Sequence, residues 1–270
     1  PNAPELVGAH AVIWTTTPWT IPVNQALAYG PDVEYVALSL GAITSDFLRH
    51  GQAGPVVVIA WPLVSQFMDR VAPGSDVGIS VKWRGKGSDL AGAVARHPMH
   101  HLGGFFAKPR PFLPGDFVTT DAGTGLVHMA PDHGEDDFEL CKTHGLDPVF
   151  AVDGAGMYRA DWAWLGGQGS VINKKFVASD GPICSDLREA GALLAATDDF
   201  PHSYPHSWRS KAKIIFRATP QWFIPMDGPK HSPSPSGEGL GWGLSAGDAL
   251  GETSPPPPPP PPTRRGARGR

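Results

Sequence analysis

Eight consecutive prolines, at residues 255–262, most constrain what this chain can fold into. They lie in a segment, residues 228–270, that also holds three further prolines and nine glycines and ends in the basic sequence TRRGARGR. Such a segment buries too little apolar surface to offset the entropy of ordering its backbone, and the proline run favours an extended polyproline conformation. We therefore expect residues 228–270 to be disordered and the folded part to lie within residues 1–227. A ligand for a proline-recognising domain is the alternative interpretation, which is disfavoured because the stretch lacks the specific basic-flanked spacing that such ligands use.

The charge of the folded part excludes one class of function. Hydrophobic residues make up 41% of the chain, enough to bury a sizeable core. The tail takes five of the 22 basic and three of the 26 acidic residues, which leaves 17 against 23, a net charge of −6, in residues 1–227. General nucleic-acid binders are built from clustered cations, so any RNA contact here must be local. The candidate patches are residues 208–217 (WRSKAKIIFR) and the pair Lys174 and Lys175, and ordinary surface charge explains either equally well.

The cysteines, the apolar runs and the first residues bear on the setting of the chain. Cys141 and Cys184 have no partner at metal-ligand spacing, which argues against a disulfide framework or a zinc ribbon and favours a reducing, cytoplasmic setting. No run of 18 or more apolar residues occurs and the start lacks the pattern of a signal peptide, so we expect no membrane span. Strand-like sequence begins by residue 10 without an initiating methionine, which we interpret as the mark of a piece of a larger protein.

Short runs rich in β-branched residues, bounded by proline and glycine, predict a mainly β fold. Strands are expected at residues 10–17, 33–40, 55–60, 115–120 and 126–131. Helices are expected at residues 61–72, 134–145 and 180–191. Many short strands with few helices between them favour an α+β, mainly β, class with a β-barrel-like or twisted mixed sheet and flanking short helices.

Three features of the folded part could share one cleft. A threonine triplet, residues 15–17 in WTTTPWTIPVN, ends the first expected strand; His128 ends another; Asp136 and Asp137 lie in the first turn of the helix that follows. Each has an ordinary structural explanation, because threonines favour strands, strand histidines are often core residues, and acidic residues stabilise a helix N-terminus. Together, hydroxyls, one imidazole and one carboxylate would suit binding a small cationic group and positioning water on an ester.

Other chemistries find less support in the sequence. No GxSxG elbow occurs and neither cysteine has an activating neighbour, so covalent catalysis is not indicated. The three histidines of HPMHH, residues 97–101, lack the zinc spacing with a glutamate base, so we expect no metal site.

Three segments carry a resemblance to a known family. WTTTPWTIPVN resembles the threonine-rich motif of the editing domain of isoleucyl-tRNA synthetases, and DAGTGLVHMAPDHGEDDF resembles its second editing motif. SYPHSWRSKAKIIFRATPQWFIPMD resembles the segment that returns from this insertion to the catalytic core. The resemblance covers nearly all of residues 1–227. Thr17 stands where valyl and leucyl relatives usually have arginine, which favours the isoleucyl family.

The resemblance implies a function and a set of site residues. The function is hydrolysis of valine from mischarged isoleucine tRNA, and of misactivated valyl-adenylate, in a pocket that rejects isoleucine by size. Water would be the nucleophile. By the same resemblance, the catalytic residues are Thr16, His128 and Asp137, and the substrate-binding residues are Thr15, Thr17, Trp19, Asn24 and Asp136.

Individual roles follow from the same match. Asp137 would bind the substrate ammonium group, His128 would lie near the scissile ester, and the threonines with Asn24 would contact the substrate and the terminal adenosine. The indoles and prolines around the triplet would hold it rigid, because a flexing pocket wall cannot measure a methylene. The chain departs from the family pattern at Met129, Asp132 and Ser207, where threonine, glycine and cysteine are usual.

The resemblance also implies domains and partners. Residues 1–200 would form the editing domain, residues 201–227 the return segment toward a catalytic core, and residues 228–270 the disordered tail. The partners would be isoleucine tRNA mischarged with valine and the catalytic core of the parent synthetase, with no membrane. No cofactor is expected here; ATP and magnesium would belong to the parent, because the HIGH-type and KMSKS-type signatures are missing from this sequence. The alternative is a catalytically idle tRNA-binding or structural remnant of a truncated synthetase.

Overall fold

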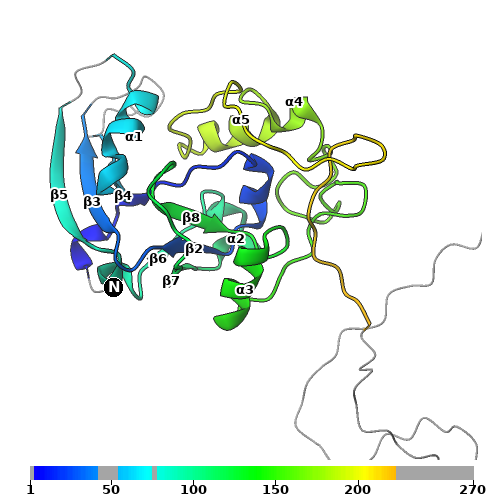
Figure 1. Cartoon of the computed structure of the whole chain (residues 1–270), viewed down its shortest axis with the longest axis horizontal. Helices are drawn as coiled ribbons and strands as arrows, with labels where there is room; N and C mark the ends of the chain where they lie inside the picture. Colours follow the sequence, from blue (N-terminus) through cyan, green and yellow to red (C-terminus); the bar gives the residue numbers. More distant parts are fainter. Residues whose placement is uncertain (1–2, 42–53, 75–77, 223–270) are drawn as a thin grey trace, which may run out of the picture. The chain divides into compact units, whose positions relative to one another are not determined.

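The computed structural model describes residues 3–41, 54–74 and 78–222 (Figure 1). The chain divides into two units, residues 1–221 and residues 222–270, and every helix and strand given below belongs to the first. The tail expected to be disordered, residues 228–270, lies outside the described residues, so its disorder stays a prediction.

The first sheet places two strands in the middle of the hydrophobic core. Its strands, in spatial order, are β1 (His10–Ala11), β4 (Val56–Ala60), β3 (Glu34–Leu40) and β5 (Ile79–Lys86). β1 runs parallel to β4, and the other neighbours are antiparallel. Helix α1 (Val64–Val71) covers one face of this sheet through Phe67 and Val71, which pack against Leu38 of β3 (Figure 1). The other face, with Tyr35, belongs to a second cluster, so β3 and β4 are buried on both sides.

The second sheet brings together segments that are distant in sequence. Its strands, in spatial order, are β6 (Val94–Ala95), β7 (Arg110–Pro114), β2 (Ala26–Tyr29) and β8 (Leu126–Met129). β2 lies in the middle, parallel to β7 and antiparallel to β8, with Leu27 opposite His128. This register sets the end of the threonine-rich segment beside the second motif.

The α-helices are short, and local sequence signals account for several of their ends. They are α1, α2 (Gly104–Ala107), α3 (Glu135–Thr143), α4 (Lys174–Val177) and α5 (Pro182–Glu189). Three acidic residues lie in the first turn of α3, where they complement the helix dipole. Gly145 and Gly191 follow α3 and α5 with positive φ, the conformation that ends a helix at low cost for glycine.

Five single-turn or two-turn 3₁₀ helices connect these elements in the described residues. They are η1 (Pro4–Leu6), η2 (Pro18–Val23), η3 (Trp61–Leu63), η4 (Gly87–Leu90) and η5 (His100–Leu102). η2 leads from the threonine triplet into β2, and its Trp19 and Val23 enter an aromatic core with Phe106, Tyr158 and Trp164. This core, rather than a sheet, supports the threonine-rich segment.

The α+β fold class is confirmed: the described residues form two small mixed sheets and a few short helices. Within the described residues the strands form two open sheets and no closed barrel. The strands expected at residues 33–40, 55–60 and 126–131 and the three expected helices are present with slightly shorter bounds.

Two expected strands are wrong in whole or in part. Residues 115–120 form turns, because β7 takes the place beside β2 and the Gly115 amide N–H donates to the Tyr29 carbonyl at 2.9 Å as the chain leaves the sheet. Of residues 10–17 only His10–Ala11 pair as a strand, because the threonines form hydrogen bonds among themselves and Pro18 begins η2.

Candidate active site

The threonine triplet forms a turn held by its own side chains. The Thr17 amide N–H donates to the Thr15 hydroxyl oxygen at 3.0 Å, and the two hydroxyl oxygens are 3.2 Å apart. All three threonines are partly buried. Within the described part of the chain the Thr16 hydroxyl makes no hydrogen bond, so of the three it is the one left for an incoming group. Side chains that bond their own backbone in this way favour turns over strands.

Thr20, which the sequence analysis did not single out, joins the triplet to His128. Its hydroxyl donates to the Thr17 carbonyl oxygen at 2.8 Å and lies 3.0 Å from His128 Nε2. A hydroxyl carries one hydrogen, so toward His128 it can only accept, and Nε2 must carry the proton. His128 Nδ1 is then an acceptor, buried and without a partner among the described residues. The protonated Nε2 is therefore the ring nitrogen that meets the threonine segment, whereas the lone pair on Nδ1 is buried.

Burial sets the protonation state of His128. Burial, with a smaller contribution from the nearby His133, lowers the pKa of this imidazole to about 4. His128 is therefore neutral near pH 7. A neutral imidazole with a free Nδ1 can accept a hydrogen bond from water, although so low a pKa makes it a weak base.

The second motif packs directly on the first. The Thr124 hydroxyl donates to the Val12 carbonyl oxygen at 2.6 Å. Gly123 has a positive φ of 84°, and a Cβ there would lie 3.4 Å from the Trp14 ring. The Asn24 amide nitrogen donates to the Ala26 carbonyl oxygen at 2.8 Å. These contacts confirm that the two motifs lie side by side, and they show Asn24 in use as a brace for β2.

Asp137 is close to β8 but does not meet His128. Its Oδ2 accepts the Ala130 amide N–H at 2.7 Å, just after β8 ends. Burial, with a smaller contribution from the neighbouring exposed Asp136, raises the pKa of Asp137 to about 6. A Cβ at Gly134 would lie 2.7 Å from the Asp137 Cγ, so glycine there gives the carboxylate its place. No hydrogen bond or ion pair joins Asp137 to His128 in the described residues.

Trp19 lies in the core behind the triplet. Its side chain is 5% exposed and meets the His133 ring edge to face, with centroids 4.7 Å apart. Its carbonyl oxygen accepts a hydrogen bond from the Tyr158 hydroxyl. No sequence pattern marked Tyr158 or His133 as part of this site. The role of Thr20 could have been predicted, because it lies three residues after Thr17, in the helical segment that begins at Pro18.

The three histidines of residues 97–101, all described by the structure, are not gathered into a metal centre. His97 is buried, and both of its nitrogens are engaged, Nε2 with the Ile21 carbonyl oxygen and Nδ1 with the Met99 amide N–H, each at 3.0 Å. His100 and His101 are exposed. Among the described residues no group of three His, Cys, Asp or Glu side chains is placed to hold a metal ion.

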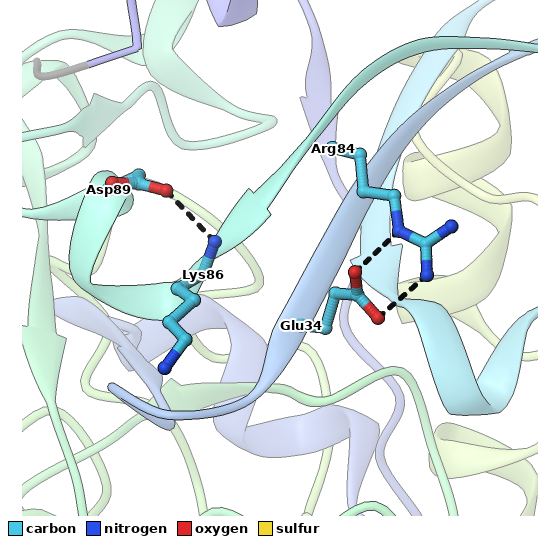
Figure 2. A network of polar contacts seen from close by, with 4 residues as sticks. All are labelled: Glu34, Arg84, Lys86 and Asp89. Carbon is cyan, nitrogen blue, oxygen red and sulfur yellow. Dashed lines mark hydrogen bonds and ion pairs between the residues drawn. The ribbon is translucent and has the colours of Figure 1, made fainter.

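A surface hollow of about 420 Å³ lies apart from these residues. Its lining runs over the turn between β2 and β3 and the turns after β7, and none of the predicted site residues belongs to it. Glu34, one of its lining residues, forms a two-point ion pair with Arg84 at 2.5 and 2.9 Å, beside the hydrogen bond from the Lys86 amide to Asp89 (Figure 2). This exposed pair contributes little to stability and carries no evident chemistry.

Two further observations concern the surface and the cysteines. No helix in the described ranges is both long and apolar enough to cross a membrane. Cys141 and Cys184 are both buried and free, and burial raises the pKa of each thiol.

Comparison with known proteins gives long matches to one group of curated sequences. The isoleucine–tRNA ligase of Zymomonas mobilis is 58% identical over 237 residues, which cover 88% of this chain and 24% of that protein. The isoleucine–tRNA ligase of Gluconobacter oxydans is 46% identical over 83% of this chain and 23% of that protein. This chain therefore spans about a quarter of the length of the curated relatives it matches. No family model matches it.

Likenesses to solved structures are more distant. The crystal structure of GlLeuRS-CP1 is 14% identical, with a TM-score of 0.48 over 70% of this chain and 83% of that one. The editing domain of the Plasmodium knowlesi cytosolic leucyl-tRNA synthetase is 13% identical, with a TM-score of 0.35 over 68% of this chain and 70% of that one. Both scores are too low to carry an argument about function.

Proposed function

Because this chain belongs to the isoleucine–tRNA ligase family, we propose that it hydrolyses the aminoacyl ester of isoleucine tRNA mischarged with valine. One observation carries the proposal. Thr20 and His128 are 108 positions apart, yet a hydrogen bond joins them. Further bonds link Thr20 to Thr17 and Thr17 to Thr15, so these residues form one group that ends in an unpaired imidazole nitrogen. Ligation, with its ATP and magnesium, belongs in this proposal to the parent enzyme rather than to this chain.

In the proposed reaction water attacks the ester carbonyl between the tRNA 3′-terminal ribose and valine. The carbon–oxygen bond to the ribose breaks, valine leaves as the acid, and the ribose hydroxyl takes up a proton. His128 Nδ1 accepts a hydrogen bond from the attacking water and orients it. Since burial holds the pKa of His128 at about 4, orientation accounts for its contribution better than full proton removal. Thr16, whose hydroxyl is uncommitted, would bond the substrate carbonyl or the ribose.

Asp137 would bind the ammonium group of the amino acid. One of its oxygens is occupied by the Ala130 amide, which fixes the carboxylate and leaves the other oxygen as the acceptor. The carboxylate is largely ionised at pH 7, because its pKa is about 6. A charged hydrogen bond of this kind is stronger than a neutral one and is absent for a hydroxy acid. Asp136, exposed beside it, would add attraction at longer range.

Size selection would come from the rigidity of the triplet. The bonds between Thr15 and Thr17, and from Thr20 to Thr17, fix the turn on both sides of Pro18. One methylene in an apolar pocket is worth only about 1–3 kcal/mol, so the wall must hold its position to reject isoleucine. Trp19 and Asn24 would serve this purpose as braces behind the wall.

Contact with tRNA would be confined to small basic areas. Lys174 and Lys175 are exposed on α4, and Arg209 and Lys211 are exposed beside Trp208, whose side chain is 82% exposed. An exposed indole next to cations is suited to stacking on an unpaired base. The same return segment, residues 201–227, would lead to the catalytic core of the parent, with residues 1–200 as the editing domain, in a cytoplasmic setting.

The test is deacylation of isoleucine tRNA charged with valine or with isoleucine by the full 270-residue chain. Release of valine with isoleucine retained would support the proposal. Hydrolysis of neither ester by a folded sample that still binds the tRNA would favour the second candidate, a catalytically idle tRNA-binding remnant. That candidate draws on the acidic body and on the lack of contact between His128 and Asp137.

A further inference from the structure

The element that carries Thr20 is too short to hold its own shape. η2 has six residues, Pro18–Val23, and contains a second proline, Pro22, which has no N–H to donate. Helices of this length are unstable alone, since few hydrogen bonds offset the entropy of ordering them. The position of the Thr20 hydroxyl must therefore be set by contacts from outside η2.

Two buried side chains from other segments donate to two carbonyl groups of η2. The Tyr158 hydroxyl donates to the Trp19 carbonyl oxygen, and His97 Nε2–H donates to the Ile21 carbonyl oxygen at 3.0 Å. These carbonyls stand one residue before and one residue after Thr20. Both donors are less than 3% exposed.

The two donors are themselves held in place. His97 Nδ1 accepts the Met99 amide N–H at 3.0 Å, which leaves the single ring proton on Nε2, toward Ile21. Burial lowers the pKa of His97 to about 4, so the ring is neutral and this tautomer persists near pH 7. Tyr158 packs against Phe176, and burial raises the pKa of its hydroxyl, so it stays a donor.

We propose that His97 and Tyr158 are positioning residues that fix Thr20, and through it His128, for discrimination between valine and isoleucine. Neither touches the substrate. They hold the carbonyl groups on both sides of Thr20, so that the hydrogen bond from His128 Nε2–H to the Thr20 hydroxyl keeps one length. This inference rests on the proposed function for its consequence in selectivity, while its statement about η2 can be tested without activity. Displacement of a reacting group by about 1 Å can cost about 100-fold in rate, which is why such bracing matters.

His97 offers a matched pair of variants. His97→Gln keeps a donor at the place of Nε2, toward Ile21, whereas His97→Asn keeps an acceptor at the place of Nδ1, toward Met99. Both lose the ring and its packing against Phe106, so both lose stability alike. Only His97→Asn loses the contact to η2.

Tyr158 has a matched control elsewhere in the fold. Tyr158→Phe removes the hydroxyl bonded to η2. Tyr35→Phe removes an equally buried hydroxyl that makes no contact with η2. It donates to the Gly125 carbonyl oxygen at 2.6 Å and accepts the Gly30 amide N–H at 3.0 Å. The two changes delete the same atom from two cores.

The first measurement is amide hydrogen exchange in the full chain. It is read at the Thr20 amide within η2, at the Asn24 amide that follows η2 and bonds the Ile21 carbonyl oxygen, and at the Ala72 amide as a reference. We expect exchange at Thr20 and Asn24, relative to Ala72, to rise about three- to tenfold in His97→Asn and Tyr158→Phe. His97→Gln and Tyr35→Phe should leave this ratio unchanged. The inference would be overturned if the exchange ratio were the same in His97→Asn as in His97→Gln, and the same in Tyr158→Phe as in Tyr35→Phe.

The second measurement is the ratio of deacylation rates for valine-charged and isoleucine-charged isoleucine tRNA, at equal folded fraction. His97→Asn and Tyr158→Phe should lower this ratio about tenfold relative to their controls, because a mobile wall admits the extra methylene. Faster amide exchange at Thr20 and Asn24 with an unchanged ratio of deacylation rates would refute the role in selectivity. If the unmodified chain hydrolyses neither ester, the proposed function fails and the selectivity role fails with it, while the exchange data still decide whether His97 and Tyr158 position η2.

Discussion

Replacing Thr20 with valine should expose how much the threonine segment depends on one hydroxyl. Valine keeps the β-branched shape and therefore the local backbone preference, but it removes the acceptor for His128 Nε2–H and the donor to the Thr17 carbonyl oxygen. Thr20 is 7% exposed, so water cannot readily replace the lost partner. The Nε2–H is left as a buried donor with no acceptor, or the ring must turn.

The size of the effect follows from this unsatisfied donor. A buried polar group without a partner costs about 1–3 kcal/mol, and in a domain of this size that loss lowers the melting temperature by roughly 2–12 °C. Thr20→Ser is the control, because it keeps the hydroxyl and loses only a methyl group, worth about 1 kcal/mol. Urea unfolding of both variants, with the slope checked for constancy, gives the comparison.

A second readout concerns the tautomer of His128. Nitrogen chemical shifts should show Nε2 protonated and Nδ1 bare in the unmodified chain at pH 7, and a shifted population in Thr20→Val. A valine variant no less stable than the serine variant, or an unmodified chain with the proton on Nδ1, would refute the reasoning about the Thr17, Thr20 and His128 hydrogen bonds.

Three further predictions concern charge. Burial raises the pKa of Asp137 to about 6, so the rate of valine release should fall as pH drops through 6, and Asp137→Ala should abolish valine release. A rate that stays constant from pH 5 to pH 8 would contradict the ammonium-binding role. Asp132 is 3% exposed, neither of its oxygens makes a hydrogen bond of good geometry, and burial raises its pKa to about 6 despite the Val149 and Ala151 amides and Arg217. A raised carboxyl pKa means that the free energy of unfolding falls as pH rises from about 4 to about 6. Urea unfolding should therefore show that Asp132→Asn stabilises the chain by about 2 kcal/mol at pH 8 and by less at pH 4.5. Equal stabilisation at the two pH values would exclude this cause. If Arg209 and Lys211 contact phosphates, changing both to Ala should lower the slope of log affinity for isoleucine tRNA against log salt by about 2, whereas an unchanged slope would place the RNA elsewhere.

The sequence by itself determined the elements whose signals are local. The continuous β-branched run at residues 56–59 favours a buried strand, and α3 and α5 end where glycine takes a positive φ. The two motifs were also visible as sequences, and with them the set of candidate residues. Near-neighbour sterics and hydrogen bonds decide such features, so they can be read without knowing the partners.

Only the tertiary structure decided which of these residues meet. β7 rather than residues 115–120 pairs with β2, because strand pairing depends on a partner that no local pattern specifies. The Asp137 carboxylate bonds the Ala130 amide instead of turning toward His128, since a buried amide just beyond a strand needs an acceptor. His128 finds its partner in Thr20, 108 positions away, because the register of β2 on β8 brings them together, and that register is set by burial of both strands in a common core.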